Sequence, residues 1–242
     1  MTEIDPHVRP VNSSGPLKLC SYNIHACVGG DGTLRPDRTA RVLREIDASI
    51  VALQEVEQHR VGREDMLQYL GRKSRLEVIS GPTFKRENRQ YGNVLMTCLP
   101  VIEVRRLNLS MAGREPRGAL DVSLDWQGRV LQVIATHLGL KPGERRRQIR
   151  QILTRFETQK SDYSVLMGDL NEWLLWGRPL RWLRGHFKPT PNIATYPARC
   201  PLLALDQLWV NPFNALGKLE AHQSALSKIA SDHLPLKAEL IP

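Results

Sequence analysis

The sequence lacks any apolar run long enough to cross a bilayer. No uninterrupted stretch of its 242 residues approaches the roughly 20 apolar residues that a transmembrane helix needs. Its first residues, MTEIDPHVRPVNSSGPLK, are polar, contain three prolines and lack the apolar core of a signal peptide. We therefore expect a cytoplasmic protein with no transmembrane segment, in which residues 1–16 form a flexible tail and residues 17–242 form one domain.

The sequence also has few cysteines and no paired cysteine motif. No CxxC occurs among the four cysteines, which are Cys20, Cys27, Cys98 and Cys200. This spacing argues against a zinc site and favours reduced cysteines that pack inside a cytoplasmic protein.

Acidic residues are fewer than basic ones. Lys and Arg number 34 against 25 Asp and Glu, which gives a formal net charge of +9, and the sequence pI is near 9.7. This balance favours a polyanionic partner, whether nucleic acid, an anionic lipid surface or a phosphorylated small molecule. With 41% hydrophobic and 24% charged residues, the composition is otherwise that of an ordinary globular protein.

Hydrophobic periodicity predicts many short strands with two or three helices between them. Helices are expected at residues 36–45, 64–72 and 141–159. Strands are expected at residues 17–24, 50–54, 76–80, 91–97, 101–107, 119–124, 129–137, 163–167, 205–210 and 236–240. Helical crossovers and a hairpin turn at DWQGR both occur, which predicts mixed sheets with helices outside them.

Polar residues follow the apolar runs at six predicted strand ends. Only four residue types occur there, at Asn23, Glu55, His137, Asp169, Asn171, Asp206, Asp232 and His233. A single carboxylate at a strand end is most often a solvated loop residue. Six such sites indicate that distant segments deliver acidic and imidazole groups to one edge of a sheet.

The motif GDLN, within LMGDLNEW, ends one of these strands. Residues i and i+2 of a strand point to the same side, so Asp169 and Asn171 could face one water, metal ion or phosphate. Gly, Asp and Asn are also common turn residues, and a purely structural turn is the alternative.

The side chains at the strand ends restrict the chemistry. Oxygen ligands without cysteine suit a hard cation, Mg²⁺ or Mn²⁺. Such a cation neutralises phosphate oxygens during phosphoryl transfer, while a placed acid or base activates water. A histidine beside a carboxylate supplies an oriented imidazole of raised basicity.

In order and spacing, the motifs SYN, QEVE, THL, GDLN, LDQLWV and SDHLP resemble the endonuclease/exonuclease/phosphatase superfamily. This superfamily includes pancreatic deoxyribonuclease, abasic-site endonucleases, inositol-polyphosphate 5-phosphatases and neutral sphingomyelinases. The resemblance spans residues 17–240 and implies an α+β fold. That fold is a four-layer α/β/β/α sandwich of two packed mixed β-sheets with helices on both outer faces. In this ordered set, we expect GDLN to be functional.

The resemblance implies a metal site and a water site. Glu55 matches the principal ligand of Mg²⁺ or Mn²⁺, and Asn23 and Asp232 match residues in or around its coordination shell. Asp169 matches the residue that positions or deprotonates the attacking water. Asn171 matches the residue that holds a phosphate oxygen.

The resemblance also implies which groups meet the scissile phosphate. His233 paired with Asp206 matches a His–Asp couple that contacts it, and His137 matches a second catalytic position. The carboxylate that orients this second histidine in pancreatic deoxyribonuclease has no counterpart in this sequence. The segments YGNVLMT and EPRGAL also resemble family segments, so Asn93 and Arg117 are expected near the phosphate.

Two arginine-rich segments allow more than one interpretation. The arginines at 145–147 and Arg150 could track phosphates, but a solvated outer helix face is favoured. Trp173, Trp176 and Trp182 alternate with arginines directly after GDLN and could stack on bases or lie at a membrane interface. Packing of at least two of them in the core is favoured.

The leading prediction is a Mg²⁺- or Mn²⁺-dependent phosphoesterase that cleaves phosphodiester or phosphomonoester bonds by in-line water attack. The basic charge favours an endonuclease or exonuclease on DNA or RNA. The compact chain and the Trp/Arg segment favour an esterase of phospholipid, inositol phosphate or sphingomyelin, and both classes stay open. An inactive binding module on the same fold would be expected to lose Glu55, Asp169 or His233, and all three are present.

Overall fold

The computed structural model describes residues 8–10 and 15–242. Most of the predicted N-terminal tail, residues 1–7 and 11–14, lies outside the described residues. Arg9 contacts the body of the protein, because its backbone N–H donates to the Arg75 carbonyl (3.0 Å) and its side chain pairs with Asp47. No helix in the described part of the chain is both long and apolar enough to span a membrane.

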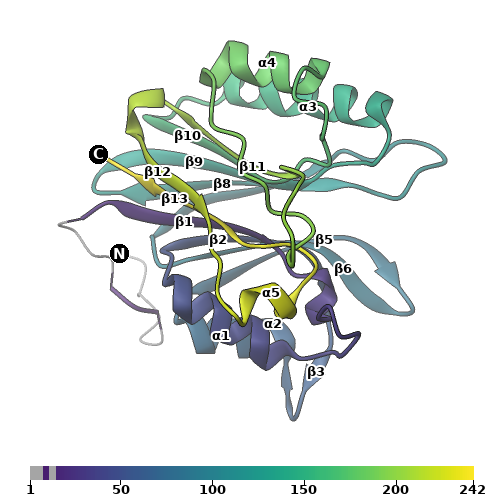
Figure 1. Cartoon of the computed structure of the whole chain (residues 1–242). Helices are drawn as coiled ribbons and strands as arrows, with labels where there is room; N and C mark the ends of the chain where they lie inside the picture. The colour runs from purple at the N-terminus through teal and green to yellow at the C-terminus, as the bar shows by residue number, and fades with distance from the viewer. Residues whose placement is uncertain (1–7, 11–14) are drawn as a thin grey trace.

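Two mixed β-sheets form the centre of the molecule (Figure 1). The six-stranded sheet has the order β12-β13-β1-β2-β6-β5, with β1 (Leu17–Asn23), β2 (Ile50–Glu57), β5 (Glu77–Arg86), β6 (Arg89–Thr97), β12 (Leu216–Ala221) and β13 (Leu236–Leu240). The five-stranded sheet has the order β11-β10-β9-β8-β7, with β7 (Val101–Asn108), β8 (Gly118–Trp126), β9 (Arg129–His137), β10 (Tyr163–Asp169) and β11 (Asp206–Asn211). The pairs β1–β2 and β9–β10 are parallel, and the other pairs are antiparallel.

Helices cover the outer face of each sheet. The six-stranded sheet carries α1 (Pro36–Ile46), α2 (Met66–Ser74) and α5 (Ser227–Ala230), and the five-stranded sheet carries α3 (Pro142–Thr158) and α4 (Arg178–Phe187) (Figure 1). Short 3₁₀ turns occur at His25–Cys27 and Phe213–Ala215, and a small hairpin joins β3 (Arg60–Val61) to β4 (Glu64–Asp65). The predicted four-layer α/β/β/α sandwich is therefore confirmed.

Three apolar clusters hold these layers together. The largest lies between the sheets and includes Leu19, Ile50, Leu95, Val133 and Met167, all fully buried. Two further clusters join each sheet to its own helices. Because the central strands are buried on both faces, their sequences are continuous apolar runs, which periodicity analysis detects as strands.

Several elements differ from the sequence prediction. The helix expected at 64–72 begins later, because Glu64–Asp65 forms β4 and the Asp65 carboxylate caps α2 by accepting from the Leu67 N–H (2.8 Å). The helix α4 and the edge strand β12 were not predicted. The hairpin turn at DWQGR is confirmed, since β8 and β9 pair as far as Trp126 and Arg129.

The cysteines are free, and three of them pack inside the protein. Cys20, Cys27 and Cys98 are buried, whereas Cys200 is exposed. The packing prediction is confirmed for the first three.

Candidate active site

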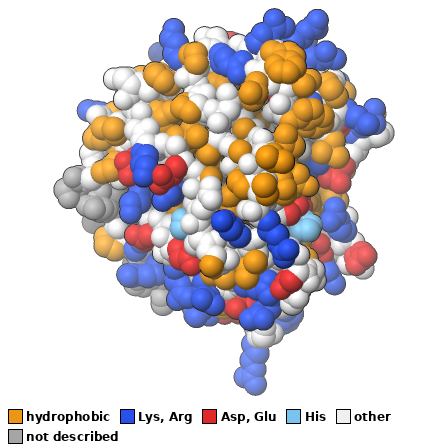
Figure 2. Space-filling model, in the orientation of Figure 1, with side chains coloured by type: hydrophobic (Ala, Val, Ile, Leu, Met, Phe, Trp, Pro, Cys, Tyr) orange, Lys and Arg blue, Asp and Glu red, His pale blue; other side chains and the backbone are white. Residues whose placement is uncertain are grey.

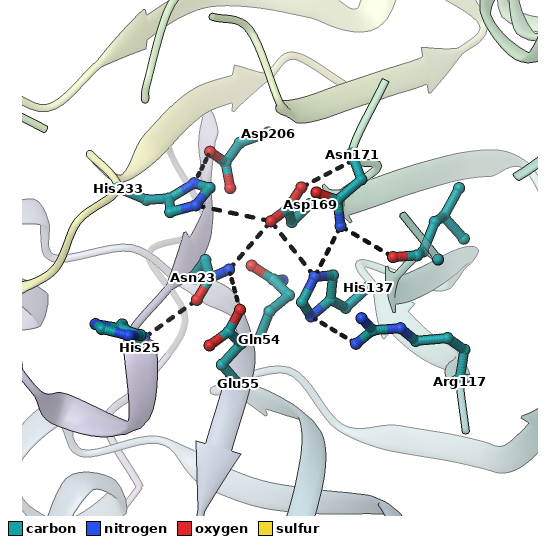
Figure 3. Close-up of polar contacts among 12 residues, drawn as sticks. Asn23, His25, Gln54, Glu55, Arg117, His137, Asp169, Asn171, Asp206 and His233 are labelled. Carbon is teal, nitrogen blue, oxygen red and sulfur yellow. Dashed lines mark hydrogen bonds and ion pairs between the residues drawn. The ribbon is translucent and has the colours of Figure 1, made fainter. Parts of the chain in front are cut away.

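The strand register places three polar side chains side by side. Asp169, the last residue of β10, pairs with His137 on β9 and with Asp206 on β11. The ends of β1 and β2, which carry Asn23 and Glu55, face them from the other sheet (Figure 3). The predicted strand-end residues therefore meet between the two sheets, at one edge of the sandwich.

Asp169 lies at the centre of this group and is almost completely buried. One carboxylate oxygen, Oδ1, accepts from the Asn171 N–H (2.9 Å). The other, Oδ2, accepts from Asn23 Nδ2 (3.1 Å) and lies 3.5 Å from His137 Nε2 and 3.8 Å from His233 Nε2 (Figure 3). Four segments of the chain therefore place nitrogen atoms around one carboxylate.

The GDLN segment is both a turn and part of the site. β10 ends at Asp169, and Asn171 has a left-handed backbone (φ +51°), so the turn rather than the strand pleat aims its side chain. Asn171 Nδ2 lies 3.0 Å from His137 Nε2 and donates to the Leu138 carbonyl (2.9 Å). Gly168 is required locally, because a Cβ there would lie 1.9 Å from the Thr136 carbonyl oxygen.

Glu55 is aimed into the site by a β-bulge. The pairing of β2 with β6 shifts register between Leu53 and Val56, and Glu55 has φ +55°. Its half-buried carboxylate accepts from Asn23 Nδ2 (3.1 Å), the same amide that contacts Asp169. Burial, and then the nearby Glu55, raise the pKa of Tyr91, which was not among the predicted site residues.

His233 and Asp206 form the predicted couple. His233 Nδ1 lies 2.8 Å from Asp206 Oδ2, which also accepts from Thr195 Oγ1 (2.5 Å). The Tyr196 ring packs 4.8 Å from the imidazole. Burial lowers the pKa of His233, but Asp206 and the neighbouring carboxylates outweigh this effect and raise it to about 10, so the ring is a cation at neutral pH.

His137, in contrast, is a neutral imidazole at neutral pH. Arg117 NH1 lies 3.3 Å from its Nδ1, while the Asn171 amide faces Nε2. An imidazolium would place N–H groups against both of these donors. Burial lowers the pKa of His137 to about 4, and Arg117 adds to this effect while Asp169 opposes it. The Nδ1 side of His137 therefore faces an arginine.

Asn93 and Arg117 line a small cleft together with Glu55 and His137. Asn93 Nδ2 donates to the Gly118 carbonyl (2.9 Å), which links the two sheets. Arg117 is almost completely buried and also pairs with an exposed glutamate, Glu115 (3.0 Å). The structure therefore brings both secondary candidates to the site, with these polar contacts already made.

Asp232 joins the site on the Asn23 side. Ser231 Oγ donates to the Asn23 carbonyl (2.7 Å) and to Asp232 Oδ1 (3.3 Å). His25 Nδ1 lies 3.9 Å from Asp232, and its backbone N–H donates to Asn23 Oδ1 (3.1 Å). His25 was not among the predicted site residues, although it lies two residues after Asn23.

A second set of potential metal ligands exists besides Glu55. Ligand atoms of Asp169, Asp206 and His233 lie within 4.8 Å of one another. Metal binding there would require His233, whose pKa is raised to about 10, to release its proton. The half-buried carboxylate of Glu55 suits a hard divalent cation better.

Two expectations beside the site are wrong at least in part. Arg147 and Arg150 are exposed on the helix face as expected, but the side chain of Arg145 is fully buried and pairs with Glu172 (3.1 Å). Trp173 and Trp176 are exposed rather than packed in the core, and Trp182 is half-buried. Glu172, the partner of Arg145, and the two exposed tryptophans all lie in the segment directly after GDLN.

Comparison with known proteins shows the family. Residues 20–233 match the model of the Endonuclease/Exonuclease/phosphatase family, so the chain belongs to this family. An uncharacterised Escherichia coli K12 protein, YbhP, is 26% identical over 219 residues, which cover 82% of this chain and 85% of YbhP.

Solved structures show the same fold. The crystal structure of an endonuclease/exonuclease/phosphatase from Beutenbergia cavernae matches with a TM-score of 0.75 and 23% identity, covering 94% of this chain and 72% of that one. A mannosyl-6-phosphatase from Bacteroides thetaiotaomicron matches with a TM-score of 0.74 and 15% identity, covering 93% of this chain and all of the other.

Proposed function

We propose that the protein is a Mg²⁺- or Mn²⁺-dependent phosphoesterase that cleaves phosphodiester or phosphomonoester bonds by in-line attack of water. The observation that carries this proposal is the buried Asp169 carboxylate, surrounded by Asn23, His137 and His233 at the edge of the sandwich. Residues 17–242 would form the catalytic domain. A family of phosphoesterases and the mannosyl-6-phosphatase of the same fold support this chemistry.

Glu55 would hold the divalent cation, with Asn23 and Asp232 around it. These residues offer only oxygen ligands, as Mg²⁺ and Mn²⁺ prefer, and the Asn23 amide orients the Glu55 carboxylate. When bound, the cation would supply positive charge to the phosphate oxygens.

The protein groups would divide the remaining work by their charge. Asp169 would position the attacking water and accept its proton, because its carboxylate lies among Asn23, His137 and His233, the groups proposed to surround the cation and the phosphate. The His233 cation would direct its Nε2–H at the phosphate, held in orientation by Asp206. Neutral His137 and the Asn171 amide would contact the phosphate oxygens.

The substrate would be a phosphate ester, and two classes fit. The +9 charge supports nucleic acid, which would make the protein an endonuclease or exonuclease. Exposed tryptophans beside GDLN support a phospholipid, or an inositol-phosphate or sphingomyelin-type substrate. A cytoplasmic location is proposed as well, on the ground that the cysteines are free.

A parallel assay tests the activity. Purified protein with Mg²⁺ or Mn²⁺ is incubated with plasmid DNA, abasic DNA, RNA, inositol phosphates, phosphatidylglycerol and sphingomyelin. We expect hydrolysis of at least one substrate, abolished by a chelator and strongly reduced in Asp169→Asn. Equal hydrolysis by the wild type and this variant would overturn the proposal.

A further inference from the structure

Exposed apolar side chains lie on three loops that adjoin the catalytic residues along the chain. We call this set the apolar rim; it consists of Leu140, Trp173, Leu174, Leu175, Trp176, Leu202 and Leu203. The most exposed are Leu202 (74%) and Trp176 (73%). Figure 2 shows hydrophobic side chains gathered in the upper half of this face, where the five-stranded sheet and its loops lie. The rim begins three residues after His137 and two after Asn171.

A buried ion pair fixes two of these loops to each other. Arg145 donates to both oxygens of Glu172 (3.1 and 3.3 Å) and to the Leu140 carbonyl (2.6 Å). Its guanidinium carbon lies 4.9 Å from the centre of the Trp173 ring, and Glu172 Oε1 accepts from the Leu174 N–H (3.2 Å). Because burying a charge pair costs free energy, a pair with this many partners indicates a defined loop position. The apolar side chains are thus held outward by the fold.

The third loop is fixed against the site itself. The Leu202 and Leu203 N–H groups both donate to the Tyr196 carbonyl (2.8 Å each), and the Tyr196 ring packs against His233. Tyr196 therefore supports both this part of the apolar rim and the imidazole of His233.

Within the three segments that carry the rim, the exposed charges are all of one sign. In the described segments 139–147, 172–181 and 196–203, the charged side chains that reach solvent are Lys141, Arg146, Arg147, Arg178, Arg181 and Arg199. The two carboxylates there, Glu144 and Glu172, are buried. The surface is therefore apolar with a basic border.

This combination fits an anionic bilayer better than a nucleic acid. Single-stranded nucleic acid uses aromatic rings and basic groups, but it offers nothing for leucine side chains to bury against. Five of the seven rim residues are leucines. Trp and Leu beside Arg and Lys is the pattern of a protein surface that lies in the interface of an anionic membrane.

We propose that the apolar rim docks on the surface of an anionic phospholipid bilayer. Its Trp and Leu side chains enter the interface, and its arginines and Lys141 contact the headgroup phosphates. Docking brings the proposed catalytic residues Asp169, His137 and His233 next to those phosphates. A membrane phospholipid as the substrate rests on the proposed phosphoesterase activity, whereas the docking does not.

Vesicle sedimentation without divalent metal tests the docking. The full chain is mixed with vesicles of phosphatidylcholine alone or with an equal part of phosphatidylglycerol, in a chelator. We expect the wild type to sediment with the anionic vesicles. Trp176→Ala should lower the partition coefficient by at least about tenfold, as should Leu202→Ser, because each removes a large apolar contact. Ile102→Ser is the matched control, since Ile102 is also exposed (56%) but lies on β7 at the opposite end of the sheet from the site.

The outcomes separate docking from catalysis. Asp169→Asn should sediment as the wild type does, whether or not it hydrolyses any substrate. The docking proposal is overturned if the wild type stays in the supernatant, or if Trp176→Ala and Leu202→Ser sediment as strongly as Ile102→Ser. It is also overturned if these variants weaken binding of single-stranded DNA while vesicle binding stays unchanged. Melting temperatures verify that each variant is folded.

Discussion

His137 and His233 both lie beside the Asp169 carboxylate, but His137 is neutral at neutral pH and His233 is a cation. His233 has carboxylates on two sides, which raise its pKa to about 10, whereas His137 faces two N–H donors and is buried, with a pKa of about 4. Both nitrogens nearest to Asp169 are Nε2 atoms. One site therefore offers a cation and a neutral imidazole at the same pH.

Because His137 is buried in its neutral form, the free energy of unfolding should depend on pH. Its pKa is lower when folded (about 4) than the unfolded value of 6.5. Protons therefore bind the unfolded chain preferentially between these values, and stability is lost as the pH falls from 6.5. The full effect is on the order of 3 kcal/mol. Urea unfolding at pH 7, 6 and 5 should show a decreasing free energy of unfolding.

His137→Gln isolates this contribution. His59 and His186 also have lowered pKa values, chiefly because of burial, and they give part of the slope. His233 gives none there, because its raised pKa adds stability that is complete below pH 6.5 and is lost only above it. The variant should have a smaller slope between pH 6.5 and 5 than the wild type. Equal slopes would show that His137 is not buried in neutral form.

Glu55 is expected to dominate metal binding, because it would be the main anionic ligand of a cation with few protein ligands. Isothermal titration calorimetry of Mn²⁺ binding to Glu55→Ala should show a metal affinity at least about tenfold lower than that of the wild type, or roughly 1.4 kcal/mol. Asp206→Asn should bind Mn²⁺ as the wild type does. The reverse result would place the metal at Asp169, Asp206 and His233.

Single residues were predicted where a strand end identified them. Asn23, Glu55, His137 and Asp169 follow apolar runs, and strand register then brings them together. The Arg117–His137 contact could not be predicted, because it depends on how β8 and β9 pair and on the path of the preceding loop. Arg145 was misjudged because its partner, Glu172, lies 27 residues away in a loop.

At the scale of elements, the end of β10 depends on one glycine. Gly168 has φ +149°, and a Cβ would lie 1.9 Å from the Thr136 carbonyl on the neighbouring strand β9. Any side chain would thus separate the two strands that hold Asp169 and His137. The glycine of GDLN serves strand packing, while the two polar residues serve the site.

Gly168→Ala should therefore destabilise the protein by at least about 3 kcal/mol, because backbone must move. Gly128→Ala is the matched control: it also has positive φ (+79°) but meets nothing within 4 Å. Backbone strain alone should cost it roughly 1 kcal/mol. Urea unfolding of both variants measures the difference. Similar losses of stability in the two variants would mean that the clash with Thr136 does not account for the effect of Gly168→Ala.

The helix α4 shows why one element was missed. Its buried residues Leu180, Leu183 and Phe187 follow helical spacing, but Pro179 and Gly185 interrupt the pattern. Pro179 lies in the first turn, where the missing N–H has no partner to lose. The helix begins only after Trp176, so the preceding tryptophans remain in a loop and stay exposed.

For the whole molecule, periodicity predicted mixed sheets with helices outside them, whereas the four-layer order was implied by the resemblance of the ordered motifs to the family. Burial on both faces makes the central strands apolar throughout, and the ordered motifs fix which strand ends meet. The edge strand β12 has half-buried residues and no such apolar run, so periodicity did not detect it. Surface features such as the apolar rim depend on the conformations of loops, which hydrophobic periodicity does not predict.

Catalysis by Asp169 is the central claim, and Asp169→Asn tests it most directly. The variant keeps the shape of the side chain but loses its negative charge and places an amide among groups that donate hydrogen bonds. We expect kcat to fall by roughly 10²–10⁴-fold, the usual contribution of a positioned acid or base. Melting temperature should fall by only a few degrees.

Turnover and melting temperature are measured on the same preparation, with the substrate that the parallel assay identifies. A low kcat in a folded variant that still binds Mn²⁺ is the predicted result. A folded or destabilised Asp169→Asn that turns over at nearly the wild-type kcat per folded molecule would contradict the account.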